Sequence, residues 1–230
     1  MGGVIGKIES SDVWVPETIL DTKIKEAMQR RETQGSTLRS FNRILLKFPK
    51  IDKNLRKCKD TFQEFDEDRN GAIDPEELKH CFRKLQIIFT DEEIDELFKA
   101  CDINDDMVIK FNEFIVLLCI VYLLKDDLAE EKSRIGLPKL EATFETLVDA
   151  FVFLDKNKDG YVSRSEMIES VNESGEQSGM IAMKRFDEMD WDHNGTVNFK
   201  EFLFAFTSWV GIDDNEDEGD ENVEAKPRHP

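Results

Sequence analysis

The chain has 230 residues, 40% of them hydrophobic and 35% charged, and its formal net charge at pH 7 is -19. This content suffices for one large or two small hydrophobic cores, and the excess of acids argues against binding of nucleic acids, whose phosphates it repels. The most apolar stretch, residues 114–124, is 11 residues long, which is too short for a membrane helix of about 20 residues.

Residues 1–57 form a basic N-terminal extension, with 12 Lys and Arg against 7 Asp and Glu. Within it, residues 37–48 are predicted to be an amphipathic helix, because apolar side chains recur at spacings of three and four. Three interpretations stay open: a solvated helix on the core, intramolecular docking of residues 37–48 in an apolar groove, and contact with a membrane. The pattern consists of Leu38, Phe41, Leu45 and Phe48, with Arg39, Arg43, Lys47 and Lys50 among them.

The N-terminus is a candidate lipidation site. After removal of Met1, Gly2 would carry the free amine to which myristate is attached. The usual motif has Ser or Thr at the sixth position, where this chain has Gly6, so the match is incomplete. One myristoyl chain binds membranes only marginally, and the basic extension would supply a second attraction. Membrane contact is therefore expected if Gly2 is myristoylated.

A twelve-residue window occurs four times, with Asp or Asn at positions 1, 3 and 5 and Glu at position 12. The windows, here called loops 1 to 4, begin at residues 66, 102, 155 and 190, so two close pairs are joined by a longer connector. Their side chains are Asp66, Asp68, Asn70 and Glu77 in loop 1; Asp102, Asn104, Asp106 and Glu113 in loop 2; Asp155, Asn157, Asp159 and Glu166 in loop 3; and Asp190, Asp192, Asn194 and Glu201 in loop 4.

Apolar residues at spacings of three and four flank every loop and predict a helix on each side. The predicted class is therefore all-α, with one pair of helix-loop-helix units in residues 58–125 and another in residues 140–211. Residues 126–139 form the connector, where Gly136 and Pro138 argue against a continuous rigid helix. The acidic segment 212–230 is predicted to be a disordered tail, either simply solvated or bound to a basic surface.

The spacing within the loops suits a hard divalent cation. Ca2+ takes six to eight oxygen ligands, and the loop must turn sharply at position 6, where Gly accommodates positive φ. Position 7 supplies a backbone carbonyl and position 9 often acts through water. The position 7 residues are Ala72, Val108, Tyr161 and Thr196, and the candidates at position 9 are Asp74, Ser163 and Asn198.

Position 8 of each loop holds a β-branched residue, which favours a short antiparallel pairing between the two loops of a pair. We expect Ile73 to pair with Ile109, and Val162 with Val197.

Loops 1, 3 and 4 match the pattern D-x-[DN]-x-[DN]-G-x5-E completely. On this motif the chain resembles the EF-hand superfamily, and in particular its plant-type calmodulin-like branch, over residues 58–125 and 140–210. The resemblance implies two EF-hand pairs, Ca2+ as the ion held by the loops, and amphipathic helices of target proteins as partners.

Loop 2 departs from the pattern, because Met107 replaces Gly and Lys110 stands at position 9. A non-Gly residue at positive φ costs on the order of 1–2 kcal/mol, and Lys110 places a positive charge beside the ion. We expect three competent sites, with loop 2 either roughly tenfold weaker or a structural loop held by its partner. In loop 1, the additional acid Asp74 favours competition by Mg2+.

The apolar faces fit a calcium sensor that exposes grooves on binding, a calcium buffer, or a structural subunit with bound Ca2+. The second pair contains several methionines that suit an adaptable groove, although core packing explains them equally: Met167, Met180, Met183 and Met189. No nucleophile elbow, phosphate loop or zinc-ligand pair is present, so no catalytic residue and no enzyme activity are expected. The four cysteines form no C-x-x-C pair, which predicts reduced core residues in a cytoplasmic protein.

Overall fold

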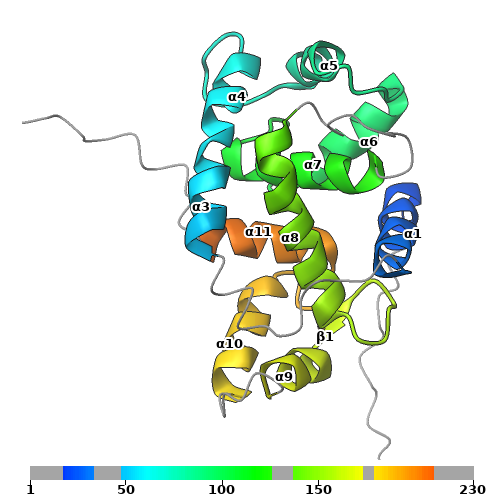
Figure 1. Ribbon diagram of the computed structural model, residues 1–230. Helices are drawn as coiled ribbons and strands as arrows, with labels where there is room; N and C mark the ends of the chain where they lie inside the picture. Colours follow the sequence, from blue (N-terminus) through cyan, green and yellow to red (C-terminus); the bar gives the residue numbers. More distant parts are fainter. Residues whose placement is uncertain (1–17, 34–47, 126–136, 173–178, 210–230) are drawn as a thin grey trace, which may run out of the picture.

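The computed structural model describes residues 18–33, 48–125, 137–172 and 179–209 (Figure 1). These residues are mainly helical and include one two-stranded antiparallel sheet, which confirms the predicted all-α class. None of the helices in the described ranges combines the length and hydropathy that crossing a bilayer requires. Gly2, residues 37–47 of the predicted helix, and the tail 212–230 all lie outside the described residues.

In the described part of the chain, two helices precede the first lobe, and eight more flank the loops. The helices before loop 1 are α1 (Ile19–Thr33) and α3 (Phe48–Arg56). The first lobe comprises α4 (Cys58–Phe65), α5 (Pro75–Lys84), α6 (Asp91–Cys101) and α7 (Phe111–Leu124). The second lobe comprises α8 (Pro138–Leu154), β1 (Val162–Ser163), α9 (Arg164–Asn172), α10 (Gly179–Met189), β2 (Thr196–Val197) and α11 (Phe199–Trp209).

Helix α8 begins at Pro138, two residues before the predicted start of the second pair. Pro138 stands in the first turn of α8, where the missing N–H of proline would have no helical acceptor in any case. The residue expected to interrupt a helix therefore starts one.

The apolar stretch 114–124 forms most of α7, which is the central helix of the molecule. Every residue from Glu113 to Leu123 is buried, and α7 packs against α4 and α6 of its own lobe and against α1, α8 and α11 (Figure 1). A helix that is apolar on all sides is stable only when it is covered on all sides. The two lobes therefore share one core, as the 5.9 Å separation of the Tyr122 and Phe144 ring centroids illustrates.

Helices α1 and α3 cover this core from outside the two lobes. The buried face of α1 consists of Leu20, Ile24, Ala27 and Met28, and α1 lies against both α7 and α8. Helix α3 buries Ile51 and Leu55 and packs on α8, where Asn54 Nδ2 donates to Thr143 Oγ1 at 3.0 Å.

The methionines of the second lobe do not form one exposed surface. Met167 and Met189 are buried in the core, whereas Met180 is 87% exposed. Met167 and Met189 therefore pack the core, Met183 is half-buried, and Met180 lies on the surface.

Candidate metal centres

All four loops share one hydrogen-bond frame. The carboxylate at position 1 accepts the backbone N–H of position 6, at 2.9 to 3.2 Å, and the Glu at position 12 accepts the N–H of position 9, at 2.8 to 2.9 Å. The side chain at position 5 also accepts the N–H of position 7, at 2.8 to 3.2 Å. Backbone donors thus orient the predicted ligand side chains within each loop.

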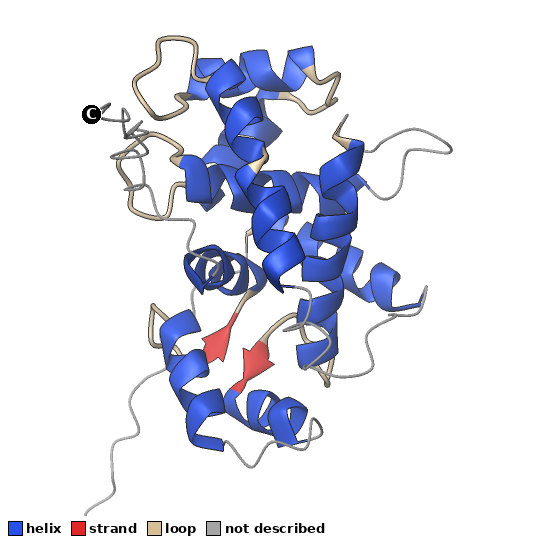
Figure 2. Ribbon diagram, turned by 60° about the vertical axis from the view of Figure 1, so that its left-hand side comes forward, coloured by secondary structure: helices blue, strands red, loops and turns tan. Residues whose placement is uncertain are grey.

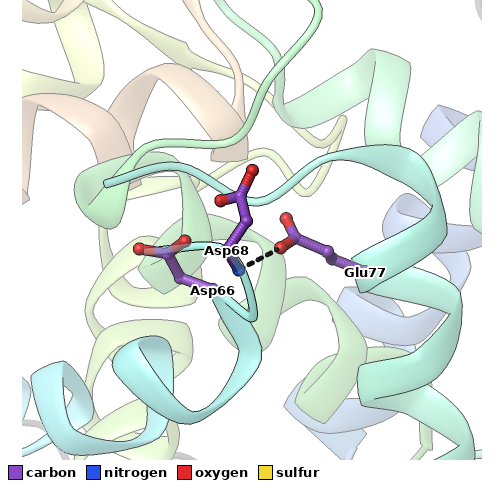
Figure 3. Close-up of side chains that lie close together, drawn as sticks. All are labelled: Asp66, Asp68 and Glu77. Atoms are coloured by element: carbon purple, nitrogen blue, oxygen red, sulfur yellow. Dashed lines mark hydrogen bonds between the residues drawn. The ribbon is translucent and has the colours of Figure 1, made fainter. Parts of the chain in front are cut away.

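Loop 1 brings three carboxylates together, as Figure 3 shows. Oxygen atoms of Asp66, Asp68 and Glu77 lie within 4.8 Å of one another. Glu77 Oε1 accepts the N–H groups of Glu67 and Asp68, at 2.9 and 3.4 Å. Carboxylates this close repel one another, and a divalent cation among them would remove that repulsion.

Position 9 of loop 1 also starts the following helix. Asp74 accepts the N–H groups of Glu76 and Glu77, both at 2.8 Å, and Pro75 follows in the first turn of α5. Glu77 in turn accepts the N–H of Asp74, which completes a capping box. The candidate ligands at positions 9 and 12 are therefore fixed by the helix they initiate.

Loop 4 has the clearest fit to a cation. Oxygen atoms of Asp190, Asp192 and Glu201 lie within 4.8 Å of one another. Glu201 is 3% exposed, and its Oε1 atom has no hydrogen-bond partner among the described residues. Burial, together with the charges of Asp192 and Asp190, raises the pKa of Glu201 to about 7. A metal ion bound by both carboxylate oxygens of Glu201 would give this oxygen a partner.

Loop 3 has the same frame but a more spread set of charges. Its acids do not form a close three-carboxylate group of the kind found among the described residues of loops 1 and 4, and Asn157 Nδ2 donates to Asp159 Oδ2 at 2.8 Å. Burial raises the pKa of Asp155. Burial acts in the same direction on Glu166, but hydrogen bonds from Ser163 and other donors lower its pKa overall.

Loop 2 shows the physical effect of its two departures. Met107 adopts a φ of 67°, whereas the Gly residues at position 6 of the other loops have φ between 85° and 88°. Lys110 Nζ lies 2.6 Å from Asp106 Oδ2 and holds the pKa of Asp106 below its usual value. Burial raises the pKa of Glu113. An ammonium group of the chain itself thus neutralises one of the candidate ligands.

The predicted pairing between loops is confirmed in both lobes. Ile73 and Ile109 exchange backbone hydrogen bonds of 2.9 and 2.8 Å, and Val162 pairs with Val197 in the two-stranded sheet (Figure 2). All four side chains are fully buried. The loops of each lobe are therefore joined back to back, so that the conformation of one constrains the other.

The predicted ligands come from the four loops, but sequence reasoning missed the residues of α1 that touch loop 3. Gln29 Nε2 donates to the carbonyl oxygen of Lys158 at 3.4 Å, and Lys25 Nζ lies 5.9 Å from the centroid of the Tyr161 ring. The available signal was the apolar pattern Leu20, Ile24, Ala27 and Met28, which has the spacing of one helical face.

Paired helix-loop-helix units with acidic twelve-residue loops define a class of ion-binding protein, and the family model for the EF-hand domain pair matches residues 55–118 and 144–207. The chain belongs to the EF-hand family and is a calmodulin-like member of it, as predicted.

The chain is similar in sequence to known proteins over most of its length. It is 68% identical over 220 residues to the probable calcium-binding protein CML21 of Arabidopsis thaliana, which covers 94% of this chain and 95% of the relative. It is 42% identical over 189 residues to the probable calcium-binding protein CML22 of the same plant, which covers 79% and 82%. A match of 24% identity to calcium-dependent protein kinase 34 of A. thaliana covers 80% of this chain but only 32% of the kinase.

Proposed function

We propose that this protein is a calcium sensor, which binds Ca2+ in loops 1, 3 and 4, binds it more weakly in loop 2, and regulates target proteins. The observation that carries the proposal is the close group of carboxylates of Asp190, Asp192 and buried Glu201, in which Glu201 Oε1 has no hydrogen-bond partner in the described part of the chain. The similarity to relatives named as probable calcium-binding proteins supports the identity of the ion. We propose a binding and regulatory role for the chain, without catalysis of its own.

In each competent loop, the side chains at positions 1, 3, 5 and 12 and the carbonyl at position 7 would hold the ion. The ion would neutralise carboxylates that otherwise repel one another. Backbone donors already orient the ligands, so little reorganisation is needed in loop 1. Its additional acid, Asp74, favours competition by Mg2+ at this site.

A sensing role is favoured by the way the loops connect to the core. The position 12 residues of loops 2 and 4, Glu113 and Glu201, lie in the first turns of α7 and α11. These two helices pack against each other. A change at either loop therefore acts directly on the interface between the lobes, where a target would respond to it.

A calcium buffer is the second candidate, and a constitutively loaded structural subunit the third. The closed, shared core around α7 favours the buffer, because buffers change shape little on binding. A sensor and a buffer would contain the same apolar side chains, so only a change in their exposure when Ca2+ binds distinguishes the two functions.

Titration calorimetry with Ca2+ and Mg2+, combined with fluorescence of an apolar dye, tests the proposal. A sensor should bind Ca2+ with at least three strong sites and show higher dye fluorescence when saturated. Glu77→Gln should remove one of these sites. Saturation without any change in dye fluorescence would favour a buffer, and an absence of binding heat would refute calcium binding altogether.

We further propose a cytoplasmic location, with membrane association through a myristoylated Gly2. Mass spectrometry of the protein made in eukaryotic cells tests the modification. An unmodified N-terminus would remove the reason to expect membrane contact.

A further inference from the structure

Helix α1 lies beside both lobes (Figure 1), and four of its apolar side chains are buried. Leu20, Ile24, Ala27 and Met28 are between 2% and 6% exposed, and the helix packs on α7 of the first lobe and α8 of the second. Ile24 and Met28 lie beside Phe151 and Phe199 of the second lobe. The surface beneath α1, formed by α7, α8, the start of α11 and loop 3, is called the inter-lobe surface below.

Ion pairs hold α1 to both lobes. Lys23 Nζ lies 2.9 Å from Glu93 Oε1 in the first lobe, and Lys200 Nζ of the second lobe lies 3.0 Å from Asp21 Oδ1. Helix α1 therefore pairs an acid of its first turn with one lobe and a base two residues later with the other.

The C-terminal end of α1 makes the most buried of these pairs. Arg31 Nη2 lies 2.6 Å from Glu145 Oε1, and Arg31 Nε lies 3.3 Å from Asp149 Oδ1. The side chain of Asp149 is only 8% exposed, and a carboxylate buried to this degree needs a cationic partner. The inter-lobe surface thus has a built receptor for a basic residue at this end.

The inter-lobe surface also adjoins a candidate calcium site. Gln29 donates to the carbonyl of Lys158 at position 4 of loop 3. A Cβ atom added to Gly160, at position 6, would lie 3.2 Å from Lys25 Cγ. An occupant of this surface is therefore in contact with the loop that is proposed to bind the ion.

Helix α1 is joined to the rest of the chain by a long segment. Fourteen residues separate Thr33 from Phe48. Helix α1 supplies none of the eight helices that flank the loops. Its departure would leave each helix-loop-helix unit intact and would expose the part of the core that it covers.

We propose that the inter-lobe surface is where this protein binds a helical segment of its target, and that α1 occupies it in cis until the target replaces it. The expected partner is an amphipathic helix with the pattern that α1 presents. Counted from Leu20 as position i, it has apolar residues at i, i+4 and i+8, a small residue at i+7, an acid at i+1, and bases at i+3 and i+11. This inference rests on the proposed regulatory function and specifies the site at which it acts.

The probe for the test is a fluorescent peptide with the sequence of residues 18–33. In the parent protein, α1 competes at an effective concentration that can reach the millimolar range, so the peptide should bind weakly. Ala27→Glu places a charge in the apolar face of α1 without altering the inter-lobe surface. In full-length protein with this substitution, the affinity for the peptide should rise at least tenfold.

Two matched controls separate docking from general damage. Glu26→Gln, at an exposed neighbouring position of α1, should leave the weak binding of the parent unchanged. A peptide that itself carries Ala27→Glu should not bind any of the proteins. Adding Asp149→Arg to the Ala27→Glu protein should weaken binding of the normal peptide, and a peptide with Arg31→Asp should recover part of it.

The proposal is overturned if the Ala27→Glu protein has the helical circular dichroism of the parent but binds the peptide no better. If that variant does not fold, Lys23→Ala combined with Arg31→Ala weakens α1 docking by removing its ion pairs. An unchanged affinity of this double variant for the peptide would also overturn the proposal. Calcium calorimetry on the same samples keeps the two hypotheses apart. Absence of calcium binding would contradict the proposed function, whereas absence of peptide binding with calcium bound would contradict only the docking site.

Discussion

In loop 2, the Nζ atom of Lys110 lies 2.6 Å from the Oδ2 atom of Asp106. The lysine stands at position 9, where Asp74, Ser163 and Asn198 stand in the other loops, and each of those accepts a hydrogen bond from the first turn of the following helix. A lysine side chain has no acceptor, so position 9 gives α7 no cap, and the N–H of Glu113 donates to Asn112 Oδ1 at 2.9 Å instead. One substitution therefore removes a helix cap and places a competing cation beside a ligand.

Lys110→Asn should increase the calcium affinity of loop 2 roughly tenfold, because it removes the competing ammonium and restores an acceptor for the first turn of α7. Calorimetry would show either one more strong calcium site or a higher affinity at the weak site. Lys53→Asn, which removes an exposed lysine of α3, should leave the affinities unchanged. Equal binding by the parent and Lys110→Asn proteins would contradict this interpretation of loop 2.

Glu201→Gln should abolish strong calcium binding in loop 4, because it removes the bidentate carboxylate at position 12. Since Val197 pairs with Val162, the affinity of loop 3 should fall as well, by a factor within the 5- to 150-fold range of typical site coupling. The stoichiometry and affinities from calorimetry check both effects. Glu169→Gln, at an exposed position of α9, is the matched control. An unchanged calcium affinity of loop 3 would show that the pairing of Val162 with Val197 does not couple the two sites.

Asp74→Ala should destabilise the metal-free protein by about 1 kcal/mol, since it removes the cap of α5. Urea denaturation in the presence of a chelator measures this effect separately from any change in ion binding. Gln63→Ala, at an exposed position of α4, should alter the free energy of unfolding by less than about 0.5 kcal/mol. If both variants were equally stable, Asp74 would have no role as a cap.

Phe144→Ala should destabilise the protein by about 3–5 kcal/mol, because the Phe144 side chain is fully buried and lies against Tyr122 of the other lobe. Denaturation of the parent protein should show a single transition, since α7 belongs to the core of both lobes. Thr146→Ala, which removes a hydroxyl bonded within its own helix, is the control. Two separate transitions in the parent would contradict a shared core.

The four cysteines should not react with a thiol reagent in the folded protein. Burial raises the pKa of Cys58 and Cys101 to about 12 and also raises that of Cys81 and Cys119. The thiolate is the reactive form, and it is scarce at neutral pH when the pKa is high. With a reagent that releases a coloured product on reacting with a thiolate, the absorbance of that product should rise only when denaturant is added. Rapid labelling of the native protein would show that a described helix opens readily.

The candidate ligands were accessible to sequence reasoning because each site is local. All the residues that would hold an ion lie within twelve positions, and the turn at Gly71 or Gly160 depends on the φ of a single residue. The pairing of Ile73 with Ile109 followed from position 8 of two loops that share one motif. The conflict in loop 2 was equally local, since Lys110 and Asp106 are four residues apart in the same loop.

The arrangement of the lobes was not accessible in the same way, because it depends on contacts between distant segments. The apolar run 114–124 indicated burial, but only the tertiary structure shows that α11 and α1 provide part of the cover. The amphipathic pattern at residues 37–48 is longer and more basic than the apolar face of α1, whose position is defined only by contact with segments such as Phe151 and Phe199. The sequence by itself thus determined the four loops and their differences. Tertiary structure alone decided which helix lies across both lobes, because that choice depends on the shape and charge of surfaces assembled from both halves of the chain.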